Sequence, residues 1–151
     1  MGFIFGRTSD DKLNTCHLDL QLILRTAIAR SKVDFGVSEG HRRKDRQYQL
    51  FLEGKSKIDG ITKEGKHNKT PSEAADIYIY HPDTETRRKL AYDKVHLAYV
   101  AGVIDAVAHE LLKAGKIEHR VRWGANWDND GIIDLDQAFD DYPHHEIIKT
   151  S

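Results

Sequence analysis

Residues 65–80 read GKHNKTPSEAADIYIY, and they join a long polar segment to the clearest strand pattern in the chain. Small or apolar side chains alternate with more polar ones from residue 74 to residue 80, which predicts a strand with one buried face. One face carries Ala75, Ile77 and Ile79, and the other carries Asp76, Tyr78 and Tyr80. The preceding residues, 54–72, hold three glycines and one proline. We expect a long loop there, and long loops inside compact domains are often functional.

Helix and strand patterns flank this stretch on both sides. A helix is expected to begin near Ser9, with an apolar face that continues to Ala27. A second helix is expected over 44–53, and the longest one from HPDTETRRK (81–89) to near Gly115. Short strands are expected in VDFGVSEG (33–40), around HRVRW (119–123) and around HHEII (144–148). This order predicts an α+β fold in which helices pack on a small, mainly antiparallel sheet.

Length and composition predict a single globular domain over 1–151, with 39% hydrophobic and 31% charged residues. Lys and Arg number 23 against 24 Asp and Glu, which gives no general attraction to nucleic acid or to an anionic membrane. Cys16 is the one cysteine, so no internal disulfide can form, and its place on an apolar helix face predicts burial. The apolar run at the N-terminus is too short for a secretory signal. We also expect no stretch that approaches the roughly 20 apolar residues of a membrane span.

Two segments far apart in the chain carry side chains suited to a metal site. His67 lies in the polar loop and Asp76 near the start of the predicted strand, while DDYPHHEI (140–147) adds Asp141 and His144. Two histidines and one carboxylate can hold a zinc ion and leave a position for water, as hydrolytic zinc sites require. A further carboxylate can take the proton from that water.

The spacing of Asp141 and His144 needs a bend in the chain. Residues three apart point to opposite faces of a straight strand. Pro143 argues against a straight strand at this point. We therefore expect a turn that brings both side chains to one site.

Five segments, in order, resemble the zinc peptidases that cut peptidoglycan stem peptides. They are SEGHRR, LFLEGKSK, GKHNKTPSEAADIYIY, RWGANW and DYPHHEI. The sequence is similar to the VanY-like D-alanyl-D-alanine carboxypeptidases and, more closely, to the phage L-alanyl-D-glutamate endopeptidases, from about Val37 to Ile147. The resemblance implies a Hedgehog/DD-peptidase-like fold and a zinc metallopeptidase that degrades the bacterial cell wall as a phage endolysin.

The resemblance also implies roles for individual residues. The zinc ligands of the family fall on His67, Asp76 and His144. Its general base falls on Asp141, and the arginine that stabilises the oxyanion falls on Arg42.

Two of these assignments have a neighbouring alternative. Arg43 could replace Arg42, and either arginine could be one more charge on an exposed helix. His145 adjoins His144, but the spacing from Asp141 favours His144 as the ligand. We expect His145 to be structural, in contact with Tyr142 or with the substrate.

The segment WDNDGIIDLD (127–136) begins like a calcium-binding loop but lacks the glutamate at position 12 of an EF-hand. Calcium-regulated members occur in the family that the chain resembles, so Ca²⁺ is a second candidate cofactor beside Zn²⁺. The alternative is a turn rich in Asp and Asn. The carboxylates in question are Asp128, Asp130, Asp134 and Asp136. Trp123 and Trp127 are expected to pack as core or loop anchors rather than to line a groove.

The expected substrate is a peptidoglycan stem peptide, bound by a monomer with no nucleic acid partner and no membrane insertion. We expect synthesis in the host cytoplasm, without a signal peptide, and access to the wall or periplasm once the membrane is opened. A D-alanyl-D-alanine carboxypeptidase and a non-catalytic wall-binding module are the alternatives. A metal-dependent nuclease, suggested by HNK (67–69), is disfavoured because no basic stripe is evident.

Overall fold

The computed structural model describes residues 2–133 and 140–150. Its four strands form one antiparallel sheet in the order β1-β2-β4-β3. The strands are β1 (Phe35–Glu39), β2 (Ala74–Ile79), β3 (His119–Gly124) and β4 (Asp141–Lys149). The helices are α1 (Arg7–Leu13), α2 (Leu18–Arg30), α3 (Lys44–Leu52), α4 (Thr84–Leu90) and α5 (Lys94–Lys113), with a 3-10 helix η1 (Lys66–Asn68). The predicted α+β class with an antiparallel sheet is confirmed.

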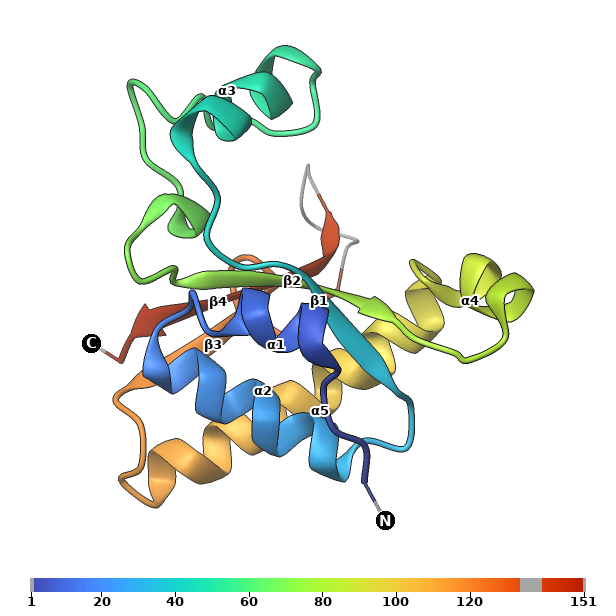
Figure 1. The fold of residues 1–151 in the computed structure, drawn as a ribbon. Helices are drawn as coiled ribbons and strands as arrows, with labels where there is room; N and C mark the ends of the chain where they lie inside the picture. The colour runs from blue at the N-terminus through green and yellow to red at the C-terminus, as the bar shows by residue number, and fades with distance from the viewer. Residues whose placement is uncertain (1, 134–139, 151) are drawn as a thin grey trace.

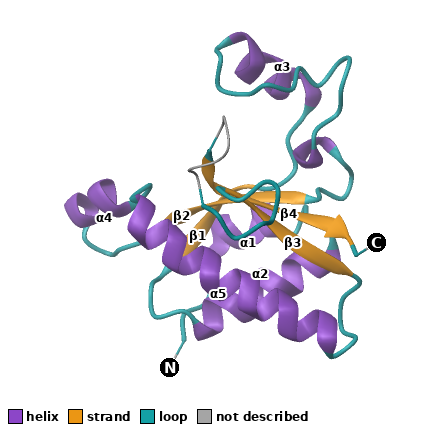
Figure 2. Cartoon of the chain, turned by 180° about the vertical axis from the view of Figure 1, so that it is seen from behind, coloured by secondary structure: helices purple, strands orange, loops and turns teal. Residues whose placement is uncertain are grey.

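The sheet separates a helical layer from a protruding arm (Figure 1). Helices α1, α2 and α5 cover one face of the sheet, and the core lies between them and the strands. Helix α3 and its flanking loops stand away from the other face, and the view from behind shows the same separation (Figure 2). One face of the sheet therefore packs into the core, and the opposite face is available for a functional site.

The alternation predicted for β2 is confirmed. Ala75, Ile77 and Ile79 are at most 1% exposed and belong to the core. Asp76 lies on the opposite face, towards the arm that carries α3. Cys16 is 2% exposed, as its apolar neighbours predicted, and burial raises the pKa of its thiol to about 11.

The single helix expected from Ser9 to Ala27 is wrong, because the chain breaks between α1 and α2. Cys16 forms an isolated bridge with Ser72. The backbone N–H of Ser72 donates to the carbonyl of Thr15 at 3.0 Å, and that of His17 donates to the carbonyl of Ser72 at 2.8 Å. Backbone hydrogen bonds to the distant Ser72 replace helical hydrogen bonds at this point, although apolar residues continue at helical spacing.

The long helix expected from residue 81 is also two helices. Asp93 caps the second one, α5, because its carboxylate accepts a hydrogen bond from the backbone N–H of His96 at 3.0 Å. Helix α4 ends just before this cap and projects beyond the sheet (Figure 1).

Helix α5 corrects our expectation about membrane spans. Its 20 residues are long and apolar enough to cross a membrane by length and composition. However, one side of α5 packs into the core through Leu97, Val100, Ile104 and Val107. A core helix of a globular domain meets the same criteria, so its composition follows from burial against α2 and the sheet.

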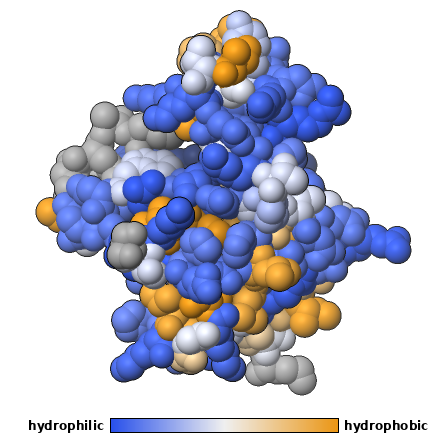
Figure 3. All heavy atoms as spheres, turned by 90° about the vertical axis from the view of Figure 1, so that its left-hand side faces the viewer, coloured by the Kyte–Doolittle hydropathy of each residue, from blue (hydrophilic) through white to orange (hydrophobic). Residues whose placement is uncertain are grey.

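The arm formed by α3 contributes little to the core. Gln47 is its buried residue, and its amide nitrogen donates to the carbonyl of Ile58 at 2.7 Å, which ties the helix to the loop after it. Polar side chains cover most of the face shown in Figure 3, with apolar patches in its lower half and at its top, over α3. Phe51 and Leu52 of α3 are exposed. The arm thus lies outside the core and stands above the sheet.

Candidate active site

The register of the sheet places three polar side chains in one row. Asp76 of β2 lies opposite Glu39 of β1 and opposite His144 of β4. Directly opposed residues of antiparallel strands share a face, with their side chains in contact range. The row therefore crosses three strands on the face that is turned away from the core.

The 3-10 helix η1 adds His67 to this row. The backbone N–H of Arg42 donates to the carbonyl of His67 at 2.8 Å. The Asn68 side chain donates to the carbonyl of Arg42 at 2.9 Å and accepts from the backbone N–H of Gly65 at 2.8 Å. These bonds hold the His67 ring, 4% exposed, over Asp76.

The structure brings the three predicted zinc ligands together. Oδ1 of Asp76 lies 3.1 Å from Nε2 of His67 and 3.2 Å from Nδ1 of His144. One potential ligand atom from each residue lies within 4.8 Å of the other two. Two imidazole nitrogens and one carboxylate oxygen are a donor set that zinc accepts.

The remaining ring nitrogen of each histidine has its own acceptor. Nδ1 of His67 lies 2.7 Å from the carbonyl of Gly40, and Nε2 of His144 lies 2.8 Å from Oε1 of Glu146. A proton on each of these nitrogens leaves the other nitrogen of the ring free to bind a cation. This arrangement, in which outer partners fix the tautomer, is typical of metal-binding histidines.

The charges of the site favour a cation at the point where the three side chains meet. Burial opposes the charged form of His144, but its hydrogen bonds to Asp76 and Glu146 outweigh burial and raise its pKa to about 10. Burial would also raise the pKa of Asp76, but His67 and His144 hold it well below its usual range. The negative groups that hold a second proton on His144 would equally attract a metal cation in place of that proton.

Asp141 reaches the same pocket through an irregularity in β4. Trp123 pairs with His145, but the next residue of β3, Gly124, pairs with Asp141. The three additional residues on β4 bend the strand, as Pro143 predicted, so Asp141 and His144 line one pocket despite their spacing.

The environment of Asp141 disfavours its charged form. Burial, reinforced by the negative charge of Asp76, raises the pKa of the Asp141 carboxyl, against the opposing influence of His144 and Arg42. A carboxylate with a raised pKa accepts a proton more readily, which suits a general base.

Arg42 lies at the site and Arg43 does not. The Arg42 side chain is 10% exposed, and its guanidinium lies 2.5 Å from Glu39 and 3.4 Å from Asp76. Burial would lower the pKa of Arg42, but the hydrogen bond and charge of Glu39 outweigh it and raise the pKa. The Arg43 side chain is 80% exposed and pairs with Asp45. The geometry thus favours Arg42 over its neighbour.

Glu146 and Arg122 also belong to the site, although neither was predicted from the sequence. The guanidinium of Arg122 donates to Oε2 of Glu146 at 2.7 and 3.2 Å, and Glu146 in turn holds His144. Glu146 is two residues after His144, so both lie on one face of β4. This spacing could have indicated a residue that supports the predicted ligand His144.

Trp127 corrects the expectation that both tryptophans are anchors. Its ring centroid lies 5.2 Å from that of His144, and it lines the pocket. Trp123 does act as an anchor, because its indole N–H donates to the carbonyl of Tyr142 at 2.7 Å. His145 is 1% exposed and pairs with Ala75 of the core face, which fits the structural role expected for it. The expected alternative of contact with the substrate is wrong, because His145 does not line the pocket.

The predicted calcium segment is described in part. The Asp128 carboxylate accepts from the backbone N–H of Asp130 at 3.3 Å, and the Asp130 carboxylate accepts from that of Ile132 at 2.8 Å. Asp134 and Asp136 lie outside the described residues. The described half has the hydrogen bonds of an Asp-rich turn, and calcium binding stays a prediction.

The pocket has a volume of about 720 Å³ and lies between the sheet and the arm. Asp76, Asp141 and His144 form its floor, and residues of α3 and of the loop after it form a wall. Its dimensions suit an extended peptide segment rather than a single small ion or solvent molecule.

Comparisons with known proteins agree with this geometry. The family model described as phage L-alanyl-D-glutamate peptidase matches residues 1–148. Among solved structures, the chain is similar to the Serratia marcescens L-Ala D-Glu endopeptidase ChiX, with a TM-score of 0.72 and 23% identity over 96% of this chain and 90% of that one. A search of curated protein sequences found no match.

Proposed function

Since the chain belongs to the phage L-alanyl-D-glutamate peptidase family, and so is a peptidoglycan endopeptidase, we propose that its activity depends on zinc. His67, Asp76 and His144 are the proposed ligands. The observation that carries this proposal is the convergence of their donor atoms within 4.8 Å of one another.

The donor set favours zinc among the divalent cations. Imidazole suits zinc, copper and nickel, whereas magnesium and calcium prefer oxygen ligands. Three protein ligands leave the open coordination position of a catalytic zinc site. When bound, zinc supplies a Lewis acid that polarises the scissile carbonyl and lowers the pKa of water towards ~7.

Asp141 is the proposed general base. Its carboxylate takes a proton from the attacking water and later gives it to the nitrogen of the departing glutamate residue. The raised pKa of Asp141 supports this assignment, because the group must hold the proton between the two steps.

Arg42 is the proposed partner of the oxygen that gains negative charge during attack. Its guanidinium is already fixed by Glu39 and by Gln47, whose side-chain oxygen lies 2.9 Å away. A preorganised donor of this kind is worth roughly 3–4 kcal/mol in other hydrolases.

Cationic side chains on the pocket wall are proposed to bind the carboxylates of the stem peptide. The segment from the end of α3 to the C-cap of η1 contributes Lys55, Lys57, Lys63, Lys66 and Lys69 to the lining. A glutamate residue in the substrate supplies negative charge that these ammonium groups attract.

The proposed place of action is the host cell wall, reached from the cytoplasm after the membrane is opened. In host cells that produce the protein, lysis only after the cytoplasmic membrane is permeabilised would support this order. Lysis without permeabilisation would contradict it.

The decisive experiment compares the wild type with His67→Ala and with His109→Ala, an exposed control on α5. Each protein is assayed for zinc content and for release of peptides from purified peptidoglycan. We expect His67→Ala to lose one zinc equivalent and peptide release, and His109→Ala to keep both. Activity that survives in zinc-depleted wild type would overturn the zinc proposal. Release of free D-alanine in place of stem peptides would indicate a carboxypeptidase.

A further inference from the structure

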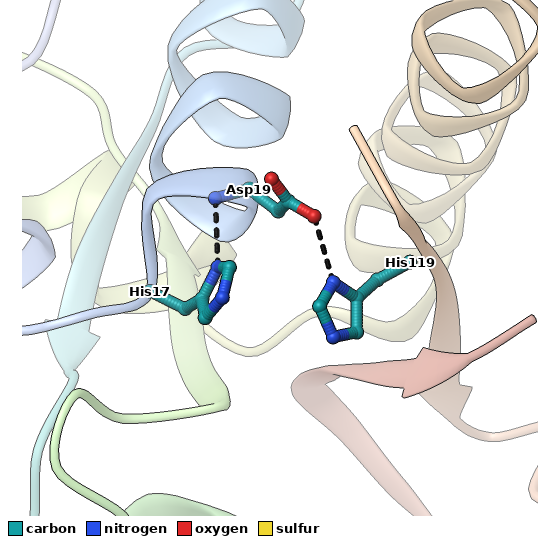
Figure 4. A group of neighbouring side chains, drawn as sticks. All are labelled: His17, Asp19 and His119. Atoms are coloured by element: carbon teal, nitrogen blue, oxygen red, sulfur yellow. Dashed lines mark hydrogen bonds and ion pairs between the residues drawn. The ribbon is translucent and has the colours of Figure 1, made fainter. Parts of the chain in front are cut away.

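A second group of metal-ligating side chains lies outside the catalytic pocket (Figure 4). His17 caps the N-terminus of α2, Asp19 lies in the first turn of that helix, and His119 is the first residue of β3. Segments about 100 residues apart in the sequence thus meet at one point.

The Asp19 carboxylate is the centre of this group. Its Oδ2 lies 2.7 Å from Nδ1 of His119 and accepts from the backbone N–H of Glu118 at 2.9 Å. The ring centroids of His17 and His119 are 4.9 Å apart. One potential ligand atom from each of the three residues lies within 4.8 Å of the other two.

We propose that His17, Asp19 and His119 bind a second divalent transition-metal ion of the zinc class. Two imidazoles and one carboxylate suit Zn²⁺, Co²⁺, Ni²⁺ or Cu²⁺ and disfavour Mg²⁺ and Ca²⁺. Metal–ligand bonds of about 2.0–2.2 Å place the ligand atoms of a tetrahedral site roughly 3.3–3.6 Å apart. Small side-chain rotations close the difference from the present spacing.

The surroundings allow an ion to enter. The side chains of Asp19 and His119 are 15% and 19% exposed, so water can reach the site and complete the coordination shell. In the catalytic centre the His67 and His144 side chains are less exposed, at 5% and 10%, whereas Asp76, at 18%, is about as exposed as Asp19.

The ion has to compete with a helix cap. Nδ1 of His17 accepts a hydrogen bond from the backbone N–H of Asp19 at 3.0 Å. A neutral imidazole has one lone pair, so metal binding by either ring nitrogen gives up this bond. The second site is therefore the weaker of the two.

Binding would join the start of α2 to the start of β3. β3 carries Arg122, which holds Glu146 beside the catalytic ligand His144. A cation at the second site would thus act as a structural clamp behind the catalytic face, and it would stabilise the fold by binding to the folded state.

The test is the number of zinc ions bound per chain, measured by titration of chelator-treated protein. We expect two for the wild type, one for His17→Asn and one for His119→Gln. Asn is itself a good helix cap, so His17→Asn keeps the capping acceptor and removes the ring. His144→Ala is expected to lose the tighter ion and keep the weaker one.

His81→Asn is the matched control. Nδ1 of His81 accepts from the backbone N–H of Asp83 at 3.0 Å, as His17 does from Asp19. Within the described residues, no third metal-ligating side chain joins His81 and Asp83. His81→Asn should therefore bind two ions, like the wild type.

A wild type that binds one ion, lost in His144→Ala and kept in His17→Asn, would overturn the second site and leave the catalytic zinc intact. One ion lost in His17→Asn and kept in His144→Ala would support the second site and contradict the proposed function. Two ions retained by both His17→Asn and His119→Gln would also overturn the proposal. Thermal melts of the wild type should show a second rise in Tm as the weaker site fills, and His17→Asn should lack it.

Discussion

Nε2 of His144 lies 2.8 Å from Oε1 of Glu146, two residues along the same strand. The other carboxylate oxygen of Glu146 accepts two hydrogen bonds from Arg122 on the neighbouring strand. The relay from Arg122 through Glu146 to His144 therefore fixes the ring orientation and directs Nδ1 towards Asp76. The register between β3 and β4 thus determines how the proposed ligand His144 is oriented.

Glu146→Gln is expected to weaken zinc binding at the catalytic centre. The amide can still accept a hydrogen bond from His144, but it removes the negative charge that raises the basicity of the ring. Loss of such outer partners typically costs 10- to 100-fold in metal affinity. Competition with a chromophoric chelator would measure the change.

Glu73→Gln serves as the control for this prediction. Glu73 also borders β2 and pairs with a cation, Lys66, at 3.0 Å, but the structure gives it no bond to a proposed ligand. Its substitution should leave zinc affinity unchanged. Equal affinities for Glu146→Gln and the wild type would remove Glu146 from the relay.

Asp141→Asn is expected to lower activity sharply and to stabilise the metal-free protein at neutral pH. The pKa of Asp141 is raised by folding, so the folded state binds more protons, and stability falls as pH rises through the folded pKa. At pH 7 the charge on this partly buried carboxylate therefore destabilises the fold, and the amide carries no such charge. Loss of a general base lowers the rate by roughly 10²- to 10⁴-fold.

Thermal melts across pH test the sign of this effect. The Tm advantage of Asp141→Asn should be largest near neutral pH and shrink as acid protonates the wild-type carboxyl. A variant with lower Tm than the wild type at pH 7 would show that the Asp141 charge is favourable to the fold.

The parts of the fold that follow from local patterns were predictable. The alternation in β2 gave the correct buried face, and α3 lies within one residue of its expected range. Periodicity failed at the two helix breaks for different reasons. Asp93 is a good capping residue, so the start of α5 could have been read from the sequence. The break at Cys16 depends on pairing with Ser72, 56 residues away, and no local pattern contains that contact.

The residues of the site were likewise predictable only in part. His67, Asp76 and His144 were predicted to be ligands from the motif, and the structure places their side chains together. Trp127 and Arg122 could not be assigned to the pocket, because their positions depend on how β3 pairs with the bent part of β4. Sequence patterns thus indicate which functional side chains the protein carries, whereas the strand register decides which of them lie together in the pocket.

Arg42 and Arg43 offer a matched pair of substitutions. Arg42→Ala removes a buried guanidinium beside Asp76, and we expect activity to fall by roughly 10²- to 10³-fold, as for other oxyanion donors. Arg42→Lys should recover little, since an ammonium cannot reproduce the planar contacts to Glu39 and Gln47.

Arg43→Ala should keep both activity and stability, because the side chain is 80% exposed. Surface changes of this kind usually alter stability by less than about 0.5 kcal/mol. Peptide release and urea unfolding of the three variants would measure these effects. A larger activity loss in Arg43→Ala than in Arg42→Ala would reverse the assignment.

Trp127 and Trp123 should respond differently to substitution because one lines the pocket and the other anchors a strand. Trp127→Ala removes a ring beside His144 and is expected to raise KM more than it lowers kcat, with little change in Tm. Trp123→Phe loses the hydrogen bond to the carbonyl of Tyr142, so it should lower stability by about 1 kcal/mol with a smaller change in KM. Steady-state kinetics on a soluble stem peptide, together with thermal melts, separate the two effects. If Trp127→Ala lowered Tm as much as Trp123→Phe and left KM unchanged, Trp127 would be an anchor, as the sequence first suggested, and the pocket wall would lie elsewhere.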